Sequence, residues 1–149
     1  MKIIVDANVV FSGILNTNGK IGDLLINSKK HFDFIAPYFL RHEIRKHYNK
    51  IISISGLTID QVEEAEYQVT KDITYISEEQ IKESNWLYAE NLVADIDPKD
   101  ISYIAFSKQF NCKIWSGDKQ LSNGLLKKGF KNIITTEELF QIRKKLEKK

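Results

Sequence analysis

The chain has 149 residues, enough for one domain that buries roughly 70% of its unfolded surface around a single core. Hydrophobic residues make up 42% of it and charged residues 28%, which excludes a mainly disordered chain. The formal net charge of +2 does not by itself indicate a nucleic-acid-binding protein, although a small total can conceal local patches of either sign. We therefore expect one compact domain over residues 1–149.

The cysteine count and the N-terminus indicate where the protein resides. Cys112 is the only cysteine, so the chain can form no internal disulfide and no cysteine-based zinc site. One lysine and three apolar residues precede Asp6, far short of the apolar region of a signal peptide. No run approaches the roughly 18 apolar residues of a membrane span. We expect a cytoplasmic protein without a membrane segment.

Short apolar runs, the first of them rich in β-branched residues, predict strands at 2–5, 32–37, 73–76, 112–116 and 132–135. Apolar periodicity predicts helices between them: a short one around Gly13, then 21–31, and then 38–52 with Pro37 at its first position. Strands that alternate with helices imply right-handed crossovers. We therefore expect a three-layer α/β/α fold around a central, mostly parallel β-sheet of four to five strands.

Helix-start signals place the remaining helices. Thr58 with Gln61, and Ser77 with Gln80, resemble capping boxes that open helices through Val69 and Leu92. Asp97 before Pro98 predicts an N-cap, with Asp100 at the third helical position of a helix through Phe106. A loop and helix follow at 116–128, and Thr136 is the expected N-cap of the closing helix at 136–149.

Four acidic residues are candidates for a shared site. Asp6 and Asp118 fall just after predicted strands, Glu43 lies on the helix after the second strand, and Asp100 lies in the first turn of its helix. In open α/β sheets, ligands bind beyond the carboxyl ends of the strands, so one folded domain could bring these four side chains together. Taken singly, each has an ordinary explanation as a helix cap, a turn or a solvated helix face.

The conjunction of the four acids favours a metal site. Carboxylates held close together would repel one another and destabilise the fold unless a cation were present. Ligation by oxygen alone suits Mg²⁺ or Mn²⁺, which activate water and stabilise charge that develops on a phosphodiester. We predict Asp6, Glu43, Asp100 and Asp118 as catalytic metal ligands, and Asn8, Asp97 and Ser116 as supporting groups.

At these residues the chain resembles a PIN domain, the small metal-dependent ribonuclease fold found in VapC-like toxins. The resemblance runs through VDANVVFSGIL, APYFLRHEIRKH and DIDPKDISYIAFSKQFNCKIWSGDKQL. It implies that Asp6, Glu43, Asp100 and Asp118 are the four acids of the family, with Asp97 an alternative to Asp100 as the third. It further implies RNA as substrate, a homodimer and a cognate antitoxin protein as partner.

Basic residues next to the acids are the candidates for contact with an RNA backbone, and we predict Arg45 and Lys119. The leading hypothesis is thus an Mg²⁺- or Mn²⁺-dependent endoribonuclease that acts as the toxin of a toxin-antitoxin pair. A non-catalytic RNA-binding or protein-interaction module on the same fold is the alternative. A small phosphatase is disfavoured, because that chemistry requires a second Asp two residues after the first, where this chain has Asn8.

Overall fold

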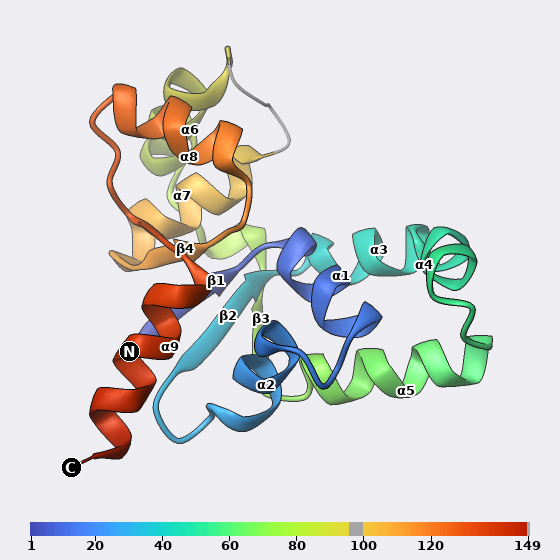
Figure 1. The fold of residues 1–149 in the computed structure, drawn as a ribbon. Coiled ribbons are helices and arrows are strands. Elements are labelled where there is room, and N and C mark those ends of the chain that lie inside the picture. The colour runs from blue at the N-terminus through green and yellow to red at the C-terminus, as the bar shows by residue number, and fades with distance from the viewer. Residues whose placement is uncertain (96–99, 149) are drawn as a thin grey trace.

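The computed structural model describes residues 1–95 and 100–148, and it contains one parallel β-sheet covered by helices on both faces (Figure 1). Within these residues the sheet has five strands in the order β3-β2-β1-β4-β5. The strands are β1 (Lys2–Val5), β2 (Asp33–Pro37), β3 (Ile73–Ile76), β4 (Lys113–Trp115) and β5 (Ile133–Ile134). The predicted three-layer α/β/α fold is therefore confirmed.

Helices connect the strands along the chain. Between β1 and β3 lie α1 (Ala7–Leu15), α2 (Lys20–Asn27), α3 (Phe39–Lys46), α4 (Tyr48–Ser55) and α5 (Ile59–Thr70). Between β3 and β4 lie the 3-10 helix η1 (Glu78–Gln80), α6 (Glu83–Val93) and α7 (Ile101–Phe110). α8 (Lys119–Lys127) precedes β5, and α9 (Thr136–Glu147) follows it. Among the described residues, no helix is both long and apolar enough to cross a lipid bilayer.

Alternating side chains of the strands build two separate cores. Ile3 and Val5 of β1 pack on one face of the sheet, in a core formed with α1 to α5 and Leu139 of α9. Ile4 points to the other face and packs in a core formed with α6, α7 and α8. This period of two is the signature of a strand buried on both sides. The two cores fix the sheet, and with it the position of the loops at its carboxyl edge.

Two helix predictions need correction. The segment expected to be one helix at 38–52 is two helices, α3 and α4, which meet at His47, and Pro37 is the last residue of β2 instead of the first residue of a helix. Ser77 caps the 3-10 helix η1 through a bond to the Glu79 N–H, and α6 begins only at Glu83. Short helices that join at an angle bury apolar side chains that one straight helix could not.

Three cap predictions have different outcomes. Thr58 and Gln61 form the expected capping box at the start of α5. For α9 the cap is Thr135, in a capping box with Glu138, while the Thr136 hydroxyl accepts a hydrogen bond from the Trp115 indole at 3.0 Å. The predicted cap Asp97 lies outside the described residues. Asp100 directly precedes α7, and the predicted helix start before it lies outside the described residues.

Candidate active site

Two of the four predicted acids follow neighbouring strands at the carboxyl edge of the sheet. Asp6 comes directly after β1, and Asp118 comes three residues after the end of β4, the strand that pairs with β1 in parallel. Each also caps a helix: Asp6 Oδ1 accepts from the Val9 N–H at 2.9 Å, and Asp118 Oδ1 accepts from the Leu121 N–H at 3.1 Å. The ordinary explanation of these residues as caps is thus correct, and the caps themselves point both carboxylates at the same edge.

The other two acids reach this edge from opposite layers. Glu43 lies on α3, which follows β2, and Asp100 lies at the start of α7, which packs on the other face. Together with Asp6 and Asp118 they line one pocket with a volume of about 480 Å³. The pocket is lined by Asp6, Ala7, Asn8, Phe11, Phe39, Glu43, Lys46, His47, Asp100, Ser102, Tyr103 and Asp118. The structure therefore brings the four predicted acids and Asn8 around one cavity.

Ser116 links the two strand-end acids. It is only 2% exposed, and its hydroxyl oxygen accepts a hydrogen bond from the Asp118 N–H at 3.1 Å. The same hydroxyl donates to the Asp6 carboxylate and so lowers the Asp6 pKa. A buried hydroxyl with one donor and one acceptor partner is fixed in orientation. Ser116 thus holds Asp6 and Asp118 relative to each other, although it does not line the pocket.

The electrostatics of Asp6 are set by burial. The side chain is 6% exposed, and loss of contact with water raises its pKa above the ordinary value of 3.8. Hydrogen bonds from Ser116 and the Val9 N–H oppose the rise, while the negative charge of Asp118 adds to it. A buried carboxylate next to a second carboxylate favours a bound cation, because a positive charge would offset both effects.

The oxygen-rich donor set fits Mg²⁺ or Mn²⁺ by its chemistry, since the pocket offers four carboxylates and the amide of Asn8. Within 1–95 and 100–148, however, no group of three or more His, Cys, Asp and Glu side chains is placed to hold a metal ion. The carboxylates surround a common space without forming a finished coordination shell. Their assignment as metal ligands stays a prediction.

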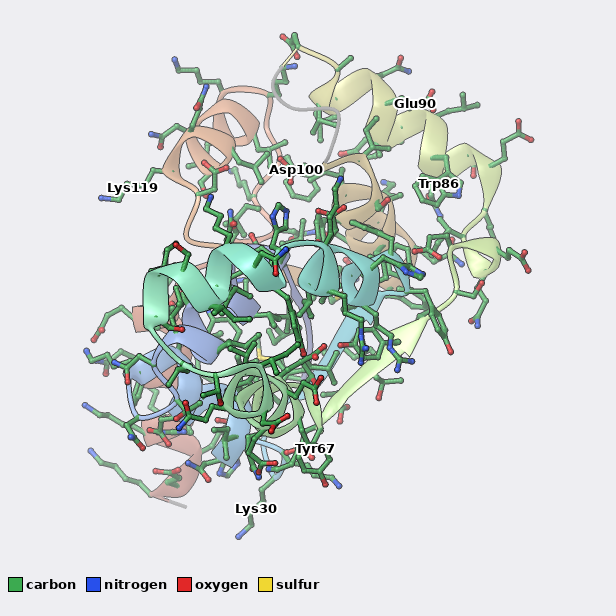
Figure 2. All side chains as sticks on the ribbon, turned by 90° about the vertical axis from the view of Figure 1, so that its right-hand side faces the viewer. Lys30, Tyr67, Trp86, Glu90, Asp100 and Lys119 are labelled. Carbon is green, nitrogen blue, oxygen red and sulfur yellow. The ribbon has the colours of Figure 1, made fainter. Side chains whose placement is uncertain are left out.

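The two cations predicted to contact substrate are not among the residues that line the pocket. Arg45 and Lys119 are both exposed, and Figure 2 shows the Lys119 side chain extending outward from α8. The pocket is instead lined by Lys46 and His47, where α3 gives way to α4. His47 Nε2 lies 3.7 Å from Glu43 Oε2, and its ring stands edge-on to Phe11 with 5.4 Å between centroids. No pattern in the sequence marks a helix break at His47, so sequence reasoning could not place these two side chains.

Tyr103 is a pocket residue that the sequence pattern identifies only as core. It follows Asp100 by three residues, which on a helix places both on one face. The side chain is 4% exposed, and burial raises its pKa, with the charge of Asp6 the next largest cause. The spacing from Asp100 was the available signal, because residues three apart on a helix share a surface.

The fold and this pocket define a parallel α/β protein with an acidic site at the carboxyl edge of its sheet. A family model described as PIN domain matches residues 4–143, so the chain belongs to the PIN domain family, as its motifs indicated. Members of this family are typically nucleases that use divalent metal ions. No curated protein matches the sequence.

Among solved structures, the chain is similar to one in "Crystal structure of VapBC2 from Rickettsia felis bound to a DNA fragment from their promoter". The TM-score is 0.62 at 12% sequence identity, and the match covers 91% of this chain and 97% of that chain. At this identity the likeness shows a shared fold. The resemblance to VapC-like proteins is confirmed at the level of architecture.

Proposed function

We propose that this protein is an Mg²⁺- or Mn²⁺-dependent endoribonuclease and the toxin of a toxin-antitoxin pair. One observation carries the proposal: Asp6, Glu43, Asp100 and Asp118, from four separate parts of the chain, line a single pocket. Membership of the PIN domain family supports nuclease chemistry. Likeness to a VapBC2 chain supports the toxin role and a cognate antitoxin. A homodimer and a cytoplasmic location are further parts of the proposal.

In this proposal the four acids would hold a divalent ion, and the chemistry it would supply there is activation of water and compensation of charge on the phosphodiester. Asp97, outside the described residues, remains the alternative to Asp100. The hydroxyl of Ser116 bonds to the Asp6 carboxylate and to the Asp118 backbone N–H, and so holds these two residues in position. Asn8 adds an exposed amide at the mouth of the pocket, where it orients water or an acid.

Substrate contact is assigned first to the cation that lines the pocket. Lys46 is exposed and pocket-lining, so its ammonium group can approach a phosphate without leaving the site. Arg45 and Lys119 are then outer contacts that attract the strand by charge. We also propose that residues 1–149 act as one domain, since the site draws on elements from β1 to α8.

The test is cleavage of RNA by the purified protein, with Mg²⁺, with Mn²⁺ and with a chelator. We expect metal-dependent cleavage that Asp118→Asn reduces by at least tenfold. Asp33→Asn is the matched control, because Asp33 is exposed at the start of β2 and lies outside the pocket. Equal cleavage by the wild type and Asp118→Asn would refute the proposal. RNA binding without cleavage would instead favour the non-catalytic module.

A further inference from the structure

Tyr103 lines the pocket but has no role in the reaction proposed above. It lies on α7 and is 4% exposed, yet it lines the pocket together with Asp6 and Asp100. Its ring packs against Phe39 at 5.6 Å between centroids, with the ring planes at 60°. This packing explains the position of the ring, but it does not involve the hydroxyl.

The Ala7 backbone N–H faces the Tyr103 hydroxyl, but the hydroxyl completes no hydrogen bond within the part of the chain that the structure describes, so its own proton has no partner. Buried polar groups in folded proteins nearly always have such a partner, because a buried donor without one loses its bonds to water and gains nothing. An unsatisfied group at a cavity wall is therefore a sign of a ligand that completes it. The hydroxyl is well suited to bind something that enters the pocket.

The chemistry of the pocket indicates what that ligand offers. Ionised carboxylates are acceptors only, so the acids of the wall cannot donate to a phosphate and in fact repel it. Lys46 and His47 supply donors, but both are more exposed than Tyr103. A phenol hydroxyl keeps its proton at neutral pH and can donate. A buried donor also forms a stronger bond than one exposed to water.

We propose that the Tyr103 hydroxyl donates a hydrogen bond to a non-bridging oxygen of the phosphate that the pocket binds. The proposal rests on the proposed function, since it assumes a phosphodiester substrate. Tyr103 would then be a catalytic residue that is uncharged. It would stabilise negative charge on the phosphate and, unlike a lysine or arginine, would form no ion pair with the surrounding acids. A donor fixed by packing in this way acts without reorganising during the reaction.

The first test is Tyr103→Phe, which removes the hydroxyl and keeps the ring on Phe39. We expect kcat/KM for RNA cleavage to fall roughly tenfold to a hundredfold, the loss associated with one hydrogen bond to a charged group. The Tm should be equal to or above that of the wild type, because the removed group has no partner in the fold. A merely structural hydroxyl would show the reverse, with a lower Tm and unchanged cleavage.

Tyr48→Phe is the matched control. Tyr48 is a half-buried tyrosine of α4 that lies outside the pocket, and its hydroxyl donates a hydrogen bond to the Glu66 side chain. Its removal should leave cleavage unchanged and lower the Tm slightly. Lower cleavage without a lower Tm in Tyr103→Phe, together with a lower Tm without lower cleavage in the control, would distinguish loss of a ligand contact from loss of a contact within the fold.

The second test changes the substrate. An RNA oligonucleotide carrying sulfur in place of one non-bridging oxygen is cleaved in each of its two diastereomers by wild type and Tyr103→Phe. Sulfur is a poor acceptor, so in one diastereomer the sulfur should slow the wild type more than the variant, in the non-additive way expected of contacting groups. Additive effects in both diastereomers would overturn the proposal. Wild-type cleavage with no change in Tyr103→Phe would overturn it as well, while leaving the proposed nuclease function intact. Absence of cleavage by the wild type would refute both the role of Tyr103 and the proposed nuclease function.

Discussion

Replacement of Asp6 by Asn should stabilise the protein while removing its activity. The Asp6 pKa is raised by burial, so the folded protein binds a proton more tightly at this site than the unfolded chain does. Stability is then greatest below the ordinary value of 3.8 and declines as the pH rises through the raised pKa. At neutral pH the buried charge is a destabilising feature, and Asn removes it.

The size of the effect follows from two contributions. Asn is as good an N-cap as Asp, so the bond to the Val9 N–H survives in Asp6→Asn and is lost in Asp6→Ala. Loss of the cap costs about 1 kcal/mol, which for a chain of this length is about 2–4 °C in Tm. Removal of the buried charge contributes a gain in both variants, because burial disfavours the ionised carboxylate. We therefore expect Asp6→Asn to melt above the wild type, because it lacks the buried charge, and about 2–4 °C above Asp6→Ala, because only Asn keeps the cap.

The assay is thermal unfolding followed by circular dichroism at pH 4 to 8 without added metal. The gap between Asp6→Asn and the wild type should narrow as the pH falls toward 3.8, because the folded wild type is then protonated at Asp6 and no longer carries the buried charge. RNA cleavage should fall in both variants. An Asp6→Asn protein that melts below the wild type at pH 7, or a gap independent of pH, would show that burial does not control this carboxylate.

Three further predictions concern substrate, packing and metal. Lys46→Ala should raise KM for RNA severalfold and Arg45→Ala should change it less, because only Lys46 lines the pocket; kinetics at two salt concentrations check this, and equal effects would contradict it. Gly22→Ala should lower the Tm, since a Cβ there would stand 2.4 Å from the Thr17 carbonyl oxygen, whereas Gly117→Ala meets nothing within 4 Å and should leave the Tm unchanged. Mn²⁺ at a hundredfold excess over its dissociation constant should stabilise the wild type by about 2.7 kcal/mol, and a similar gain in Asp118→Asn would argue against ligation by that residue.

Local patterns in the sequence were sufficient for the elements and their layers. Short apolar runs marked the five strands of the described residues, and Thr58 with Gln61 marked the start of α5. These features depend on neighbours in sequence, so a single chain reveals them. The position of Asp6 and Asp118 after strands was also visible, because the parallel topology sends the carboxyl ends of β1 and β4 to one edge.

The remaining features depended on contacts between residues far apart in sequence. At the break between α3 and α4, Lys46 lines the pocket and Arg45 does not. Tyr103, which the sequence predicts as a core residue, lines the pocket because α7 packs against the sheet. Asp100 reaches the pocket from one layer and Glu43 from the other, and Figure 2 shows Asp100 between α3 and the layer of α6 to α8. The sequence by itself determined which residues could carry the chemistry. Only the tertiary structure decided which of them face the same cavity, because burial and distance are properties of the packed layers and not of any one segment.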